Sequence, residues 1–313
     1  MVAVFVDGQA GTTGLQLMDR LAQRNDIELL QLEPAQRKER EVRQALLNQA
    51  DVAFLCLPDA AAQEAVALIT NPRTCVIDAS PAFRTAPGWI YGLPEHNSTQ
   101  RTQTRASKRI AVPGCHATAF TLLVHPLVAS GVMPPDYPVT CYSITGYSGG
   151  GKRLIQTYEE AFSPNRQSPR PAALHLQHKH LPEMQRYSGL HFAPTFVPVV
   201  GNYYKGLAVT VFLTPRLLNR SITPLELHDL FAGYYANEPF IRVMPVGDEH
   251  NLDNRCFDVQ GCNDTNRTDL FIFGEGDQMV LMARLDNLGK GSSGAAIQCM
   301  NIHLGLDETS GLQ

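Results

Sequence analysis

The chain has 313 residues, 44% of them hydrophobic, which is enough for two domains with well-filled cores. A formal net charge of −4, with no Lys/Arg run interleaved with aromatic residues, argues against nucleic acid or an anionic membrane as a partner. Seven irregularly spaced cysteines without a CxxC pair favour neither a disulfide framework nor a zinc site, so we expect a cytoplasmic protein. The N-terminal MVAVFVDG lacks a basic region and a cleavage site, so it is predicted to be a strand and not a signal peptide.

The first third of the chain alternates predicted strands and helices. Short Val/Ile/Leu-rich runs predict buried strands at 2–7, 27–32, 51–58 and 74–80. Segments with helical periodicity fall between them at 13–23, 37–49 and 59–70. This alternation predicts an α/β Rossmann-type domain with a doubly wound parallel sheet.

Three glycines occupy the first predicted strand-to-helix turn. Gly8, Gly11 and Gly14 form the run GQAGTTG, where a Cβ would block the approach of a pyrophosphate to the backbone. The amide groups at the start of the following helix favour a bound anion, and Thr12 and Thr13 add hydroxyl donors. We therefore predict a dinucleotide-binding turn, with an ordinary glycine-rich turn as the alternative.

The type of dinucleotide is not decided by the sequence. Glu33, near the end of the second predicted strand, suits the free ribose hydroxyl of NAD. Arg37 and Lys38 suit the 2′-phosphate of NADP, but they are equally consistent with a solvated helix start.

The pattern changes after residue 115. Longer strands are predicted at 139–148, 191–200 and 206–215, then a helix at 224–239, a hairpin at 269–287 turning at Gly274–Gly276, and a last helix within 289–306. Strands that follow one another without helices predict an α+β domain with a mostly antiparallel sheet. The domain is expected to have an apolar sheet face, which is either core or shared with a second subunit, because it carries five apolar or aromatic residues on alternating strands: Tyr203, Tyr204, Val209, Val211 and Phe212.

Cys115 lies between a predicted strand and a predicted helix in RIAVPGCHATAF. The partial positive charge of a helix N-terminus stabilises a thiolate, and open α/β folds bind ligands at this end of the sheet. The alternative is a small buried core residue, which is the role we expect for Cys56 and Cys75 inside predicted strands. We predict that Cys115 is a nucleophile.

The segment HLQHKHLPEM supplies a proton acceptor for such a thiol. It contains His175, His178 and His180, with Glu183 to orient an imidazole or contact substrate. A metal site and a surface histidine cluster are the alternatives. A dinucleotide turn, a nucleophilic cysteine and a histidine together predict hydride transfer through a cysteine thioester.

Five motifs resemble those of the N-acetyl-γ-glutamyl-phosphate reductase family, in its shorter form. They are VPGCHATAF (112–120), DASPAFR (78–84), YGLPE (91–95), HKHLPEM (178–184) and DNLGKGSSGAAIQCMN (286–301). The resemblance implies NADP(H), arginine biosynthesis and reversible reduction of an acyl phosphate to N-acetylglutamate semialdehyde. It also implies that Cys115 forms the thioester, with His178 or His180 as the acid–base group. Strand alternation predicts that only one of these two rings reaches the cysteine.

The resemblance also suggests which residues hold the ligands. The proposed substrate contacts are Arg84, Ser148, Gly149, Lys152 and Glu183. The proposed cofactor contacts, besides the glycine turn with its threonines and Arg37 and Lys38, are Ser80, Asn287, Lys290 and Gly291. In this family the last helix returns to the cofactor domain, so we expect an NADP-binding domain of residues 1–114 and 290–313. Residues 115–289 then form a catalytic and oligomerisation domain, and a homo-oligomer is expected.

Three positions depart from the family pattern. Asp7 directly precedes the glycine turn, and its charge would repel a pyrophosphate unless the side chain points away. Val112 stands where the family often has an Asn, and Ala82 stands where it has an acidic residue. An aspartate-semialdehyde dehydrogenase and a non-catalytic dinucleotide-sensing protein are the alternative functions. The motifs HKHLPE and YGLPE argue against an aspartate-semialdehyde dehydrogenase. A dinucleotide-sensing protein would have no unusually reactive thiol.

Overall fold

The computed structural model describes residues 1–37, 39–160 and 163–313. The chain divides into two compact units. The first unit combines Met1–Gly114 with the C-terminal segment Ser292–Gln313, and the second is Cys115–Gly291. The division therefore falls between Gly114 and Cys115 on one side and between Gly291 and Ser292 on the other.

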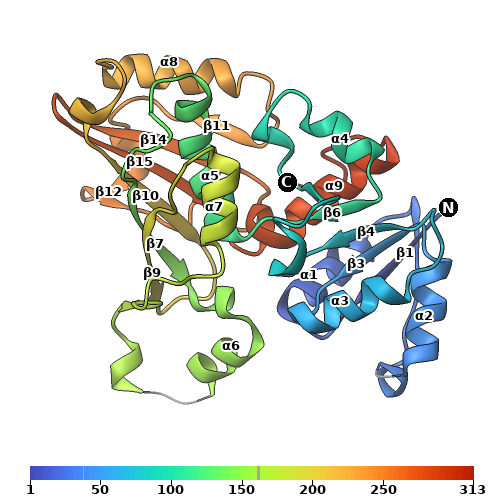
Figure 1. Cartoon of the computed structure of the whole chain (residues 1–313). Coiled ribbons are helices and arrows are strands. Elements are labelled where there is room, and N and C mark those ends of the chain that lie inside the picture. The colour runs from blue at the N-terminus through green and yellow to red at the C-terminus, as the bar shows by residue number, and fades with distance from the viewer. Residues whose placement is uncertain (38, 161–162) are drawn as a thin grey trace. The chain divides into compact units, whose positions relative to one another are not determined.

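The first unit contains a six-stranded sheet in which every neighbouring pair is parallel (Figure 1). In spatial order its strands are β2 (Ile27–Leu29), β1 (Val2–Asp7), β3 (Val52–Leu55), β4 (Cys75–Asp78), β6 (Arg109–Ala111) and β5 (Ile90–Tyr91). The order places β1 beside both β2 and β3, so the chain reverses its direction of winding there.

Helices cover both faces of this sheet. Alternate side chains of a strand point to opposite faces, and the buried residues separate into two clusters accordingly. Val4 and Val6 pack with helices α1 (Thr12–Leu21) and α9 (Gly294–Leu304), whereas Phe5 packs with α2 (Arg40–Gln49) and α3 (Asp59–Leu68). A further helix, α4 (Gln100–Ala106), contacts α9. The predicted doubly wound parallel sheet is confirmed.

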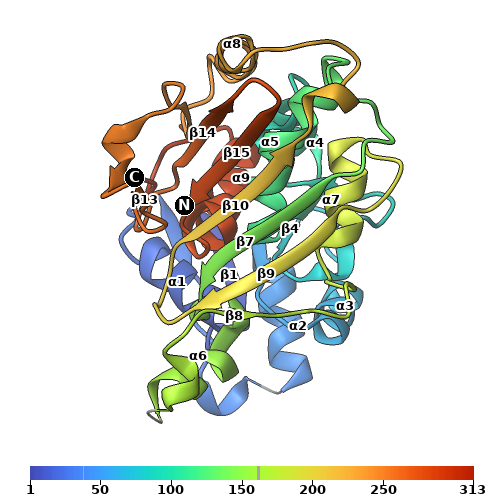
Figure 2. The same ribbon diagram turned by 90° about the vertical axis from the view of Figure 1, so that its left-hand side faces the viewer.

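The second unit is built on a seven-stranded sheet (Figure 2). In spatial order its strands are β11 (Ile241–Val243), β14 (Thr268–Glu275), β15 (Gln278–Leu285), β10 (Leu207–Leu213), β7 (Thr140–Gly146), β9 (Thr195–Gly201) and β8 (Arg170–Pro171). The pairs β11–β14 and β7–β9 are parallel, and the other four pairs are antiparallel. The predicted mostly antiparallel sheet is confirmed. A separate hairpin joins β12 (Leu252–Asp253) to β13 (Cys256–Phe257).

One face of this sheet packs on helix α5 (Cys115–Ala129), which contacts β10 and β15. The other helices of the unit are α6 (Gly151–Glu159), α7 (Leu181–Ser188) and α8 (Pro224–Tyr234). Val209 and Val211 are buried in the core, but Phe212 points to the opposite face, where it is 43% exposed and contacts Tyr142. Val209 and Val211 thus contribute to the core face of the sheet and Phe212 to the other face, because adjacent strand positions alternate. Tyr203 and Tyr204 lie in the β9–β10 connection and not on a strand.

The predicted hairpin forms between β14 and β15, although its turn lies slightly later than expected. Glu275 pairs with Gln278, so the turn consists of Gly276 and Asp277. Gly274 belongs to β14, where its φ of 109° and the nearby Gln278 carbonyl leave no place for a side chain.

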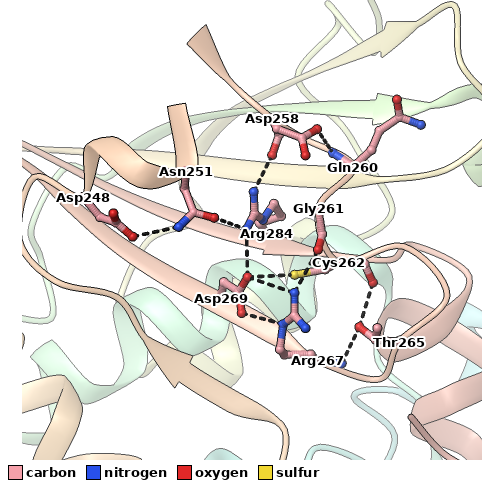
Figure 3. A network of polar contacts seen from close by, with 10 residues as sticks. All are labelled: Asp248, Asn251, Asp258, Gln260, Gly261, Cys262, Thr265, Arg267, Asp269 and Arg284. Carbon is pink, nitrogen blue, oxygen red and sulfur yellow. Dashed lines mark hydrogen bonds and ion pairs between the residues drawn. The ribbon is translucent and has the colours of Figure 1, made fainter. Parts of the chain in front are cut away.

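A buried polar network ties the segment before β14 to this hairpin (Figure 3). Asp269 of β14 accepts bonds from Arg284 of β15 at 2.9 Å and from Arg267 at 2.8 Å. The thiol of Cys262 also donates to Asp269, at 3.2 Å, and burial together with this carboxylate raises the pKa of Cys262 to about 11. Arg284 in turn donates to the carbonyl of Asp258 at 2.8 Å. One buried carboxylate thus fixes two guanidinium groups and the loop that joins β13 to β14.

The substitution Asp269→Ala should therefore destabilise the protein strongly. It leaves the buried guanidinium of Arg284 without its counter-ion, and breaking a buried pair in this way costs about 3–5 kcal/mol. Urea denaturation of the full chain measures the change. Asp229→Ala removes a carboxylate that is 83% exposed on α8 and should cost under about 1 kcal/mol. Equal, small changes in the two variants would contradict a structural role for the network.

Candidate active site

Cys115 is the first residue of α5, so its side chain lies at the positive end of the helix dipole. The Cys115 side chain is partly exposed. Burial raises the pKa values of four other thiols, those of Cys56, Cys75, Cys141 and Cys262. The pKa rises to about 12 for Cys75 and to about 11 for Cys262. These four thiols are protonated near neutral pH. Of the remaining three cysteines, Cys256 lies on β13 and Cys299 lies inside α9, so Cys115 is the one placed at a helix start, which favours a thiolate.

A tight turn of the chain packs directly against Cys115. A Cβ added to Gly291 would lie 2.6 Å from the Cβ of Cys115, so no residue other than glycine fits there without movement. The carboxylate of Asp286 holds this turn by accepting the amide protons of Leu288 at 2.9 Å and of Asp264 at 2.8 Å. Gly291, which the family resemblance assigns to the cofactor, therefore also shapes the surroundings of the nucleophile.

Asn287 and Lys290, in the same turn, are both buried within the second unit. The Asn287 side chain accepts the Gly206 amide proton at 2.8 Å and donates to the Ser148 hydroxyl at 2.9 Å. The Lys290 ammonium lies 5.7 Å from the ring centroid of Phe240. These contacts connect the turn beside Cys115 to the loop that carries Ser148.

The glycine-rich segment after β7 forms a short 3-10 turn, Tyr147–Gly150, that leads into α6. Ser148 is buried, and because its oxygen accepts the Asn287 amide, its own proton is available for another acceptor. Gly149 is exposed, and Lys152 lies in the first turn of α6. Ser148, the start of α6 and Lys152 thus lie within five consecutive residues, a combination that suits an anion.

His178 and His180 lie in a turn before α7 and not on a strand. Their ring centroids are 4.6 Å apart, and both rings meet the ring of His116, at 5.6 and 5.4 Å. The prediction that strand alternation separates the two rings is therefore wrong, because a turn brings them onto the same neighbour. His175 is exposed earlier in this turn, and Glu183 is buried in the first turn of α7.

The turn also assigns a tautomer to one of these rings. The backbone amide of His180 donates to the Nδ1 of His178 at 3.2 Å. Since Nδ1 is the acceptor, the proton of the neutral His178 ring is carried by Nε2. His178 is half-buried, whereas His180 is only 4% exposed.

His116 is a member of this group that the sequence did not single out. Its Nδ1 forms a 2.8 Å hydrogen bond with the hydroxyl of Ser143 on β7. Burial, with smaller contributions from His178 and Lys179, lowers the pKa of His116 to about 3, so the ring is neutral under physiological conditions. The available signal was its place beside Cys115 in PGCHATAF, but sequence alone does not reveal the partner on β7.

In the first unit, the glycine turn has the geometry of a phosphate cradle. Gly8 has a φ of +90°, and a Cβ there would lie 2.3 Å from the Cys56 carbonyl oxygen. A Cβ on Gly14 would lie 2.2 Å from the carbonyl oxygen of Gly8. The turn closes with a 3.0 Å bond from the Gly11 amide to the Gly8 carbonyl. Only glycine permits this close backbone packing, as a dinucleotide-binding turn requires.

Two polar side chains at this turn support the same interpretation. The hydroxyl of Thr12 and the amide nitrogen of Gln9 are buried and have no hydrogen-bond partner among the residues that the structure describes. Such groups are costly unless a ligand satisfies them, and a phosphate accepts from both. The hydroxyl of Thr13 differs, since it is bonded to Ser292 at 2.9 Å. These residues fit a dinucleotide.

The acidic residue before the turn has an internal counter-ion. Asp7 is 3% exposed and accepts two bonds from Arg43 of α2, at 2.9 and 3.1 Å. The ion pair compensates the charge that would otherwise repel a pyrophosphate. Glu33 and Arg37 are exposed, and Lys38 lies outside the described residues. Arg43 was missed by the sequence analysis because it is separated from Asp7 by 36 positions.

The DASPAFR segment follows β4 and is fixed by buried bonds. Ser80 donates to Asp78 at 2.7 Å, and burial raises the pKa of Asp78 to about 7 against the effect of this hydrogen bond. Arg84 is 7% exposed and donates to the carbonyls of Val112 at 2.9 Å and Ala79 at 3.2 Å. Arg84 is thus buried and not part of a surface ion pair, and it joins the segments that follow β4 and β6.

Within 1–37, 39–160 and 163–313, no group of three or more His, Cys, Asp and Glu side chains is placed to hold a metal ion. Across these same ranges, every helix is too short or too polar to cross a membrane.

Comparison with known proteins assigns each part of the chain to one family. Residues 3–104 match the semialdehyde dehydrogenase NAD binding domain, and residues 115–287 match the semialdehyde dehydrogenase dimerisation domain. An N-acetyl-gamma-glutamyl-phosphate reductase 2 from Nostoc sp. is 44% identical, with 99% of this chain and 98% of that protein covered. An N-acetyl-gamma-glutamyl-phosphate reductase from Burkholderia cenocepacia is 43% identical, with 96% and 97% covered.

Solved structures share the fold at much lower identity. Aspartate semialdehyde dehydrogenase II from Vibrio cholerae, complexed with ASA, superimposes with a TM-score of 0.73 at 13% identity and covers 97% of this chain and 98% of its own. Aspartate semialdehyde dehydrogenase from Francisella tularensis gives 0.72 at 13% identity, with 96% and 99% covered.

The Asp7–Arg43 pair can be tested through dinucleotide binding. Arg43→Met should leave a buried carboxylate uncompensated beside the glycine turn and weaken NADPH binding about tenfold, or about 1.4 kcal/mol. Fluorescence titration with NADPH measures the dissociation constant. Arg40→Met, at an exposed position on the same helix, is the matched control. An unchanged constant in Arg43→Met would mean that the carboxylate does not act on the cofactor.

Proposed function

The chain belongs to the N-acetyl-γ-glutamyl-phosphate reductase family of semialdehyde dehydrogenases, and from this premise we propose its reaction. It reduces N-acetyl-γ-glutamyl phosphate to N-acetyl-L-glutamate 5-semialdehyde and phosphate, reversibly and with NADPH, in arginine biosynthesis. The observation that carries this proposal is Cys115, at the N-terminus of α5 in the same unit as the histidine group.

The first unit holds the dinucleotide in this proposal. The backbone around Gly8, Gly11 and Gly14 and the hydroxyl of Thr12 bind its phosphates. Thr13, Arg37, Lys38, Ser80, Asn287, Lys290 and Gly291 complete the proposed cofactor contacts. NADPH, when bound, supplies the hydride that reduces the thioester.

The first chemical step is carried out by Cys115. Its thiolate attacks the acyl carbon of the acyl phosphate, the bond from that carbon to the phosphate oxygen breaks, and phosphate leaves with the electron pair. The product is an acyl group bound to Sγ as a thioester. The amide of Cys115, at the start of α5, donates a hydrogen bond to the oxygen that becomes negative.

A histidine moves the proton in the second step. As the thioester carbon is reduced, the acid–base histidine, in its imidazolium form, protonates the adjacent oxygen to give a thiohemiacetal on Cys115 and becomes neutral. The neutral histidine takes this proton back as the carbon–sulfur bond breaks, which releases the semialdehyde and restores the thiolate. Either His178 or His180 is assigned to this task, and the hydrogen bond between the His180 amide and the Nδ1 of His178 orients the His178 ring.

Five side chains or backbone groups are assigned to the substrate. Ser148, the Gly149 amide and Lys152 offer donors to the phosphate group, and Arg84 suits a carboxylate or phosphate. Glu183 is buried at the start of α7, where it can orient a histidine or contact the substrate amide.

Oligomerisation is assigned to the second unit. The sheet face that carries Tyr142 and Phe212 exposes both rings, at 38% and 43%, and such an apolar face is typical of a surface shared between subunits. We assign a homo-oligomer, a dimer or tetramer, and a cytoplasmic location.

Replacing the nucleophile tests the mechanism directly. Cys115→Ser should reduce phosphate-dependent formation of NADPH from NADP and N-acetylglutamate semialdehyde by about a thousandfold or more, because the alcohol is a far weaker nucleophile. The dissociation constant of NADPH should stay unchanged. Cys256→Ser, at an exposed cysteine, should keep full activity. Near-normal turnover of Cys115→Ser would rule out a thioester, and faster turnover of aspartate semialdehyde by the unmodified enzyme would reassign the substrate.

The two histidines should respond differently to the same substitution. Loss of a general acid–base group costs about 10²–10⁴-fold in kcat, so one of the variants His178→Asn and His180→Asn should suffer this loss. The other variant should lose at least about tenfold less. Steady-state kinetics over a pH series measure both. Equal and small losses would remove the acid–base role from this turn.

A further inference from the structure

His116 is adjacent to the nucleophile in sequence, and its ring belongs to a group of four rings, three buried and one half-buried. This ring cluster consists of His116 from α5, His178 and His180 from the turn before α7, and Phe196 from β9. The His116 ring centroid lies 5.3–5.6 Å from the centroids of the other three rings. His116 therefore forms the surface against which both candidate acid–base rings pack.

Ser143 fixes the orientation of the His116 ring. It is fully buried on β7, where it is paired with Val209 on one side and Pro198 on the other. Two neighbouring strands thus hold its backbone, and its hydroxyl meets the Nδ1 of His116 at 2.8 Å. A side chain on a strand held on both sides is a rigid support, so rotation of the imidazole would break a buried hydrogen bond.

The charge of His116 suits a supporting role and not a catalytic one. A ring that stays neutral across the physiological range takes no part in proton exchange, so any proton gained by the ring cluster resides on His178 or His180. A neutral ring also avoids repelling an imidazolium that forms beside it during the reaction.

We propose that His116, oriented by Ser143, is a positioning residue that fixes the His178–His180 pair for proton transfer. This inference rests on the proposed function, because the pair is assigned there to acid–base chemistry. His116 and Ser143 thus have a role in that reaction, although neither exchanges a proton with the substrate.

A double-mutant cycle separates this role from simple core packing. We expect His116→Phe, which keeps a ring of similar size, and Ser143→Ala each to lower kcat about tenfold or more. The KM of the substrate and the dissociation constant of NADPH should stay within about twofold, because neither residue is assigned to a ligand. Since Ser143 acts through His116, the double variant should be no slower than His116→Phe. Additive losses, or an unchanged kcat in Ser143→Ala, would overturn the proposal.

Ser188→Ala provides the matched control. It removes an equally buried serine hydroxyl from the second unit, at the end of α7 farthest from His180. It should leave kcat unchanged, whereas a loss equal to that of Ser143→Ala would mean that any buried hydroxyl of this unit has the same effect.

Imidazole NMR gives a readout that does not depend on turnover. In the wild-type protein, the His116 nitrogens should keep the shifts of a neutral ring down to about pH 4. Ser143→Ala should shift the His178 and His180 titration midpoints, and Ser188→Ala should not. Shifted midpoints in a protein without the expected reductase activity would disprove the proposed function and retain the positioning role. Unshifted midpoints in an active enzyme would disprove the positioning role and retain the proposed function.

Discussion

The close approach of Gly291 to Cys115 is the constraint on which the catalytic unit depends. A Cβ at residue 291 would lie 2.6 Å from the Cys115 Cβ, so the turn can pack against the cysteine only if residue 291 has no side chain. Asp286 makes the approach possible because its buried carboxylate accepts two amide protons and so fixes the turn. The nucleophile is therefore held between a helix start, which favours its charged form, and a backbone that leaves it little freedom to move.

The polar groups around this centre are organised by burial and hydrogen bonds more than by surface charge. Asn287 joins the turn beside Cys115 to the Ser148 loop, and Ser143 joins a central strand to the ring cluster. Asp269 fixes the loop that precedes β14 (Figure 3). The amide of Asp264 in this loop donates to Asp286. Ser143 and Asp269 lie on strands of the seven-stranded sheet, so the sheet fixes one end of two of these links. Such supporting residues set the precision of a catalytic group without touching the reacting atoms.

The sequence was sufficient to predict the two sheet types and most of their strands, because these strands have a local hydrophobic pattern. It did not predict β5, β8 and β11, which have only two or three residues each and therefore carry no such pattern. It was also sufficient to select Cys115 and the glycine turn, whose signals lie within a few residues. The sequence did not reveal contacts between residues that are distant along the chain. Ser143 is 27 positions from its hydrogen-bond partner His116, and Arg43 is 36 positions from its ion-pair partner Asp7. The error at His178 and His180 has the same origin, because strand alternation was assumed where tertiary contacts impose a turn.

The central claim is that Cys115 is an ionised nucleophile, and the pH dependence of its alkylation tests this most directly. Iodoacetamide labelling, followed by peptide mass spectrometry, gives separate rates for Cys115 and for Cys256, the exposed cysteine of β13. We expect the alkylation rate of Cys115 to rise with a pH midpoint clearly below about 8.5, the pKa of an unperturbed thiol. At neutral pH, Cys115 should react faster than Cys256. A midpoint at or above the pKa of an unperturbed thiol, with no advantage over Cys256, would contradict the claim.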